Sequence, residues 1–267
     1  MTTRRRLLHA AAGMVAASAM PAGVRRAHAM PRPRTWVLVH GAWHGGWCWQ
    51  RIAPHLTAAG HRVLAPSLAG LADQAHRLSG TVDLDTHIDD VVGLLARQDL
   101  RDVVLVGHSY AGLVITGVAD RAAGRVAHLV YLDAVIVGNG EAWSATHTPG
   151  RAAAWARLAA PSGGVSVPPP DASAFGIANA ADRTWVNGQL TPHPYRTYTQ
   201  KLRLSRPPGA GLRKTHIVCR GPGALSPTAR RVRIDAAGGW STRTLEASHD
   251  AMVTAPAALA TLLLAIA

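Results

Sequence analysis

A serine between small residues is the feature of this sequence that most clearly implies chemistry. Residues 107–111 read Gly-His-Ser-Tyr-Ala, which is close to the pattern G-x-S-x-G. They follow an apolar run at 102–107 and open a helical segment at 109–123. A turn from strand to helix is tight and strained here, so it needs small neighbours and lifts the serine side chain above the sheet. Ser109 is therefore the candidate nucleophile.

A serine hydroxyl is a weak nucleophile and needs a neighbouring base. In sites built on such a turn the chain order is serine, then acid, then histidine, so the base is expected near the end of the chain. His249 follows the last short strand, at 242–245. Its position and local sequence distinguish it from the other histidines, and we predict that it is the base.

The acid of the site has two candidate positions. The usual one is the turn after the strand at 215–219, but residues 220–224 read Arg-Gly-Pro-Gly-Ala and carry no carboxylate. The other known position is just after the strand that follows the nucleophile helix. There Asp133 ends an apolar strand, where an unpaired carboxylate would be costly and a histidine partner would offset the cost. Asp133 is the predicted acid, Glu141 is the alternative, and a site without an acid is the third possibility.

An oxyanion formed at Ser109 would need two backbone N–H groups. We expect one from Tyr110, directly after the serine, and one from Ala42, in the glycine-rich turn after the first strand. Trp43, His44 and His108 are expected to border the substrate, with core packing as the alternative for Trp43.

The elements that must position these residues alternate between strands and helices. Apolar runs predict strands at 35–40, 61–66, 102–107, 126–133, 215–219 and 242–245. Helical spacing predicts helices at 47–59, 83–98, 109–123 and 256–265. This alternation indicates a mainly parallel sheet with helices on both faces. Residues 134–211 break the rhythm and are interpreted as an inserted cap, so the core comprises 30–133 and 212–267.

The first 29 residues resemble an export signal. Residues 3–8 (Thr-Arg-Arg-Arg-Leu-Leu) resemble the twin-arginine motif, and a weakly apolar stretch at 10–22 is too short to anchor a chain in a membrane. Ala-His-Ala at 27–29 matches a cleavage site. The sequence therefore predicts a mature chain that starts at Met30, lies in the periplasm or outside the cell, and has no membrane anchor. A basic tail that stays attached is the alternative.

Composition narrows the function further. The formal net charge is +13, but five arginines lie in the first 29 residues and no aromatic-basic motif accompanies the charge, so nucleic acid is not an expected partner. Cys48 and Cys219 are expected to be free thiols, with one disulfide as the alternative. The histidines lack a zinc-binding spacing such as H-E-x-x-H, and we predict no metal requirement.

Several segments together resemble one family. These are residues 37–49, 83–95, 103–112, 129–134, 191–194 and 249–256. They are similar to a bacterial esterase branch related to plant methyl esterases and hydroxynitrile lyases. The resemblance implies an α/β-hydrolase fold, no cofactor, and catalysis by Ser109 and His249. Two positions depart from the plant pattern: the acid turn is Gly-Pro-Gly, and Asp250 replaces the lysine that the resemblance assigns to the leaving cyanide.

Three functions follow from these observations. The leading one is hydrolysis of a small to medium, largely apolar carboxylic ester through an acyl-enzyme, by a monomer or a homodimer. The second is cyanohydrin cleavage, against which Asp250 counts because an anion does not stabilise a departing anion. The third is a binding protein that keeps the fold with little turnover.

Overall fold

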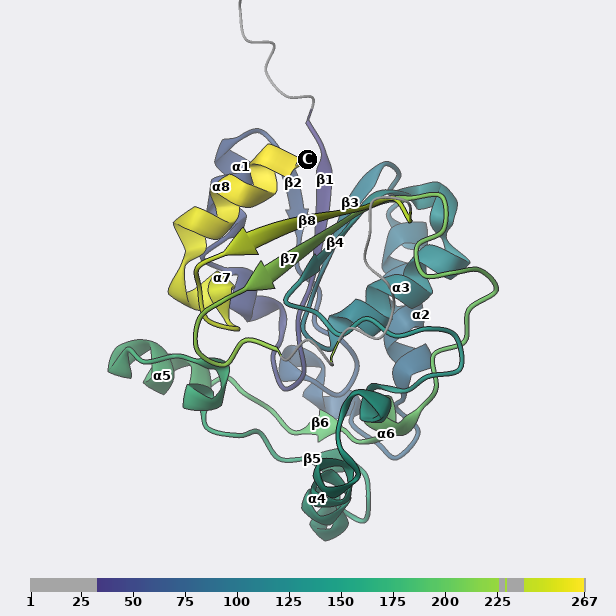
Figure 1. Cartoon of the computed structure of the whole chain (residues 1–267), viewed down its shortest axis with the longest axis vertical. Helices are drawn as coiled ribbons and strands as arrows, with labels where there is room; N and C mark the ends of the chain where they lie inside the picture. The colour runs from purple at the N-terminus through teal and green to yellow at the C-terminus, as the bar shows by residue number, and fades with distance from the viewer. Residues whose placement is uncertain (1–32, 226–228, 230–237, 267) are drawn as a thin grey trace, which may run out of the picture. The chain divides into compact units, whose positions relative to one another are not determined.

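A parallel sheet of six strands forms the centre of the structure (Figure 1). The computed structural model describes residues 33–225, 229 and 238–266, so the expected export signal lies outside the described residues. The strands are β1 (Thr35–Val39), β2 (Arg62–Leu64), β3 (Val103–His108), β4 (Val126–Leu132), β7 (Arg213–Cys219) and β8 (Trp240–Leu245). Their order is β2-β1-β3-β4-β7-β8, and every neighbouring pair is parallel. The α/β-hydrolase fold expected from the sequence is confirmed.

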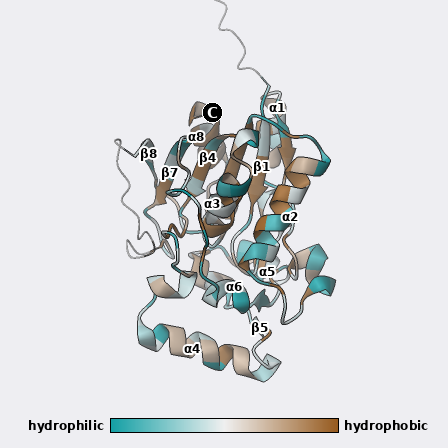
Figure 2. Cartoon of the chain, turned by 90° about the vertical axis from the view of Figure 1, so that its right-hand side faces the viewer, coloured by the Kyte–Doolittle hydropathy of each residue, from teal (hydrophilic) through white to brown (hydrophobic). Residues whose placement is uncertain are grey.

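Helices cover both faces of this sheet (Figure 1). One face carries α1 (Ala53–Ala58), α7 (Ala251–Thr254) and α8 (Pro256–Ile266), and the other carries α2 (Leu84–Arg97) and α3 (Ala111–Arg121). Because β3 lies between the two layers, all of its residues are buried, which explains its uninterrupted apolar sequence. Figure 2 shows hydrophobic residues concentrated on the strands, whereas α2 carries both kinds.

Helices α2 and α3 pack closely against each other on one face of the sheet. A capping box begins α2, since the Asp83 carboxylate accepts from the Thr86 N–H at 3.0 Å and the Thr86 hydroxyl accepts from the Asp83 N–H at 3.3 Å. Gly117 of α3 lies so close to α2 that a β-carbon would sit 2.2 Å from Cδ1 of Ile88. The small residue lets α3 pack closely between α2 and the sheet.

The helix predicted over 47–59 is wrong as a single element. The structure has a 3-10 turn, η1 (Gly46–Trp49), followed by the separate helix α1. Pro54 lies in the first turn of α1, where its missing N–H costs nothing. In one continuous helix it could not donate to the Gln50 carbonyl, and its ring would clash with that carbonyl. The described ranges also hold the 3-10 turns η2 (Ala72–Arg77), η3 (Ala123–Arg125), η4 (Trp143–Thr146), η5 (Ala160–Ser162) and η6 (Ala172–Phe175).

Between β4 and β7 the chain leaves the sheet and folds at the carboxyl ends of its strands (Figure 1). This segment holds the helices α4 (Pro149–Ala159), α5 (Ala180–Asn187) and α6 (Arg196–Thr199). It also holds the strands β5 (Ser166–Val167) and β6 (His193–Pro194), which pair antiparallel. The segment lies where the cap at 134–211 is expected.

Both cysteines are buried free thiols. Burial raises the pKa of each, that of Cys48 well above its ordinary value, so neither thiol is reactive near neutral pH. Within the described ranges, no helix has the length and apolar character needed to cross a bilayer.

Candidate active site

Ser109 lies at the strained turn between β3 and α3. Its backbone has a φ of 56°, in the left-handed region that non-glycine residues seldom adopt. The neighbouring chain secures this conformation, because the Ser109 N–H donates to the Leu132 carbonyl at 3.1 Å and the Ser109 carbonyl accepts from Val135 N–H at 2.9 Å. The small residues are required: a β-carbon at Gly112 would lie 2.0 Å from the Val135 carbonyl oxygen.

His249 stands in the loop after β8 and connects Ser109 to Asp133. Its Nε2 lies 2.9 Å from Ser109 Oγ, and its Nδ1 lies 2.7 Å from Asp133 Oδ2. All three residues are buried. With Nδ1–H donating to the carboxylate, Nε2 is free to accept the serine proton. The side chains that the sequence placed far apart thus form one continuous chain of hydrogen bonds.

Asp133, directly after β4, is the acid that reaches His249. Its φ is 37°, and its Oδ2 also accepts from the Leu225 N–H at 2.9 Å. Two donors on one oxygen reduce the cost of burying this carboxylate. Glu141, the alternative acid, instead accepts from the Gly138 N–H at 2.9 Å in its own turn.

The Gly-Pro-Gly turn after β7 supports the site by its backbone. The Pro222 carbonyl accepts from the His249 N–H at 3.1 Å. A β-carbon at Gly221 would lie 2.6 Å from the Ala247 carbonyl, and one at Gly223 would lie 2.5 Å from the Phe175 backbone. In this packing neither glycine position has room for the side chain of an acid, which fits with the acid standing on β4.

The two N–H groups expected for an oxyanion are those of Ala42 and Tyr110. In the part of the chain that the structure describes, neither donates to a protein acceptor. The next N–H along, that of Trp43, is engaged, because it donates to His193 Nδ1 at 3.4 Å. This favours Ala42 over Trp43 as the partner of Tyr110.

Of the three residues expected to border the substrate, Trp43 lines the pocket, whereas His44 and His108 lie behind it and are almost fully buried. His44 Nε2 lies 2.9 Å from Asp250 Oδ2, and His108 Nε2 donates to the His249 carbonyl at 3.0 Å. Burial lowers the pKa of His108 well below its ordinary value, and the nearby His249 lowers it further. Both histidines thus make hydrogen bonds within the protein instead of facing the pocket.

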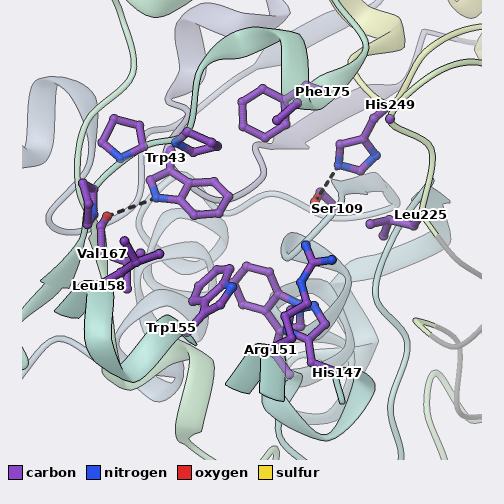
Figure 3. A pocket seen from close by; sticks show the side chains of 16 residues that line it. Trp43, Ser109, His147, Arg151, Trp155, Leu158, Val167, Phe175, Leu225 and His249 are labelled. Atoms are coloured by element: carbon purple, nitrogen blue, oxygen red, sulfur yellow. Dashed lines mark hydrogen bonds between the residues drawn. The ribbon is translucent and has the colours of Figure 1, made fainter. Parts of the chain in front are cut away.

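The pocket beside Ser109 and His249 has a volume of about 320 Å³ (Figure 3). Aromatic side chains form much of its wall: Trp43, Trp143, Trp155 and Phe175. Three of these come from the cap, where no periodicity in the sequence indicated which side chains point inward. Their only signal was the concentration of aromatic residues in a segment without regular spacing. His147 and Arg151 add polar groups.

One group of described residues has the spacing of metal ligands, namely His108, His249 and Asp250, whose ligand atoms lie within 4.8 Å of one another. Both ring nitrogens of His249 already face Ser109 and Asp133. A metal would have to break this chain of hydrogen bonds, so the group does not fit a metal centre while the site is intact.

Comparisons with known proteins agree with this geometry. A carbendazim hydrolyzing esterase of Nocardioides is 39% identical, over 86% of this chain and 98% of that protein. Methylesterase 3 of Arabidopsis thaliana is 35% identical over 38% of this chain and 39% of its own length. These relatives support carboxylic ester hydrolysis.

A solved structure matches over nearly its whole length. The extracellular alpha/beta-hydrolase from a Paenibacillus species aligns with a TM-score of 0.75 at 23% identity, covering 87% of this chain and 98% of that one. It shows the shared fold. The model of the alpha/beta hydrolase family matches residues 36–262. With a strained serine turn, a buried histidine and this match over most of its length, the chain belongs to the alpha/beta hydrolase family.

Proposed function

We propose that this chain is a serine esterase in which Ser109, His249 and Asp133 act as a catalytic triad. The observation that carries the proposal is the chain of hydrogen bonds from Asp133 through His249 to Ser109, with distances of 2.7 and 2.9 Å, at the wall of an aromatic pocket. The fold, and relatives that hydrolyse esters, support the same chemistry.

The reaction follows from the positions of the protons. Ser109 Oγ attacks the ester carbonyl as its proton passes to His249 Nε2, and the carboxylate of Asp133 stabilises the imidazolium. The carbonyl oxygen becomes an oxyanion, which accepts from the N–H groups of Ala42 and Tyr110. Collapse breaks the bond to the leaving alcohol, which takes the proton from His249. Water then repeats these steps on the acyl-enzyme and releases the acid.

The two other functions fit less well. Cyanohydrin cleavage would benefit from a cation next to His249, but Asp250 occupies that position and is fully buried. A binding protein would not need a base aligned with a strained serine. The apolar wall of the pocket supports a small to medium, largely apolar ester as substrate. All site residues come from one chain, so a monomer or a homodimer would both be active.

We also propose that residues 1–29 direct export and are removed, from the order of twin arginines, apolar stretch and Ala-His-Ala. Protein isolated from the periplasm or medium of a host with a working twin-arginine system should have an intact mass that begins at Met30. Recovery of only full-length protein from the cytoplasm of that host would contradict export.

A fluorophosphonate probe should label Ser109, as mapped by peptide mass spectrometry. His249→Ala should slow labelling by about 10²- to 10⁴-fold, because the hydroxyl then has no base. Ser109→Ala is the control and should remain unlabelled. Labelling of another residue at the wild-type rate would contradict the assignment of Ser109 as the nucleophile.

Asp133→Asn should reduce turnover of a p-nitrophenyl ester by about 10⁴-fold, since an amide cannot stabilise the imidazolium or hold the same tautomer. Glu141→Gln is the matched control and should stay within about twofold of the wild type. Unfolding in urea separates loss of catalysis from loss of fold. The opposite ranking of the two variants would assign the acid to Glu141.

A further inference from the structure

The active-site pocket has a strongly uneven charge. Its described lining is largely aromatic or aliphatic, includes no Asp or Glu, and carries one permanently charged side chain, Arg151 (Figure 3). Arg151 lies in the first turn of α4, next to the N-cap Thr148. Figure 3 shows its guanidinium directed into the cavity beside His147.

Arg151 has no partner of opposite charge among the residues that the structure describes. Within the described ranges its guanidinium makes no ion pair and no hydrogen bond. Another arginine that contacts the cap, Arg51, shows the contrast, because it pairs with Asp182 at 2.6 Å. The neighbour His147 stays neutral, since burial and the charge of Arg151 lower its pKa to about 4. The described pocket therefore offers one unpaired cation.

We infer that Arg151 binds an anionic group of the substrate, and that the preferred esters are aromatic and carry a carboxylate remote from the scissile carbonyl. The inference rests on the proposed function. A guanidinium pairs with a carboxylate through two parallel hydrogen bonds, which a neutral substituent cannot form. The faces of Trp43, Trp155 and Phe175 suit the ring that joins the two groups. Because Arg151 is exposed, solvent screens its attraction for the carboxylate. We therefore expect the anionic compound to be preferred over its neutral analogue by about fivefold to tenfold.

Binding of two unreactive ketones tests this without turnover. The probes are 4-acetylbenzoate and neutral 4-methylacetophenone, with tryptophan fluorescence as the readout. Wild type should bind the anion about fivefold to tenfold more tightly, and the advantage should shrink in high salt. Arg151→Gln should abolish the advantage of the anion and leave the Kd of the neutral ketone within twofold of the wild-type value. Arg157→Gln changes a residue on the same helix that lies outside the pocket, and this variant should still bind the anion more tightly than the neutral ketone.

Equal binding of both ketones by wild type, or an advantage that survives Arg151→Gln, would overturn the assignment. The corresponding esters, monomethyl terephthalate and methyl 4-methylbenzoate, then test the function separately. Hydrolysis of both esters at equal kcat/KM would contradict the charge preference and support the esterase function. A binding preference without hydrolysis of either ester would contradict the esterase function and support the anion-binding role of Arg151.

A second, independent observation concerns the buried pair behind the site. His44 Nδ1 lies 2.8 Å from the Ala42 carbonyl oxygen and its Nε2 lies 2.9 Å from Asp250 Oδ2, so both ring nitrogens face acceptors. Burial opposes a charge on either group, but the mutual attraction prevails, raising the pKa of His44 and lowering that of Asp250. The neighbouring His108, 3.8 Å from Asp250 Oδ1, is neutral. The two acceptors and the raised pKa together favour a proton on each ring nitrogen of His44, opposite the Asp250 carboxylate.

This pair joins two segments that the reaction needs. His44 holds the carbonyl of Ala42, while the N–H of the same peptide unit, on Trp43, donates to His193 Nδ1. Trp43 has a φ of 65°, so the turn is strained and needs such support. Asp250 directly follows His249, and its N–H donates to the Phe175 carbonyl at 3.3 Å.

We propose that His44 and Asp250 are positioning residues, which align the Ala42 N–H with the oxyanion formed at Ser109. His44→Gln and Asp250→Asn should each lower kcat by about 10- to 100-fold with KM within about threefold, because the lost alignment matters only in the transition state. Inhibition by phenylboronic acid, which forms a tetrahedral adduct on serine, should weaken in parallel. The double variant should be no worse than the single ones.

His128→Gln provides the control, since His128 is also buried and contacts the Thr215 hydroxyl at 2.8 Å, away from the pocket. It should change the urea unfolding midpoint and leave kcat unaltered. If Asp250→Asn fails to fold, the kcat of His44→Gln alone tests the positioning role. A folded variant with kcat within twofold of the wild type would show that the pair has only a structural role. Additive losses in the double variant would show that His44 and Asp250 do not act through each other, which also contradicts the proposal.

Discussion

The hydrogen bond between Asp133 and His249 is the interaction on which the rest of the site depends. It joins residues 116 positions apart, at the ends of β4 and β8, across the intervening strand β7. Because all six strands are parallel, the segments that follow them meet at one edge of the sheet. A buried carboxylate without donors is costly there, so this contact offsets part of the cost of burying Asp133 and also sets the tautomer of His249.

The position of the acid changes the role of the turn after β7. Gly221 packs too closely against the His249 loop, and Gly223 against the cap, for either position to carry a side chain, and the turn contributes backbone groups instead. The Leu225 N–H reaches Asp133 and the Pro222 carbonyl holds His249. The turn thus positions acid and base without supplying either. The cap contributes three of the four aromatic residues of the pocket wall, and Trp43 of the core contributes the fourth.

Much of this architecture could be predicted from local sequence. Buried strands such as β3 have no polar alternation, and the small residues around Ser109 follow from the strain of its turn. Asp133 could be predicted because a carboxylate that ends an apolar strand needs a partner. The break in the helix at 47–59 was also encoded locally, by Pro54, but the apolar pattern concealed it.

The roles of the other histidines could not be predicted, because their partners lie far away in the chain. His44 meets Asp250 only after both ends of the core have folded together, and no spacing in the sequence indicates that contact. The same holds for Trp143 and Trp155, which face the pocket from a segment without a regular period. Tertiary packing alone decides which of these side chains line the pocket.

Proton NMR of the hydrogen bond between Asp133 and His249 is the most direct test of Asp133 as the acid of the site. In proton NMR of the wild-type protein, the Nδ1–H of His249 should give a strongly downfield resonance, assigned by its loss in His249→Ala. This resonance should persist in Glu141→Gln and disappear in Asp133→Asn. Its persistence in Asp133→Asn, or its loss in Glu141→Gln, would contradict the assignment of the acid and the organisation of the site built on it.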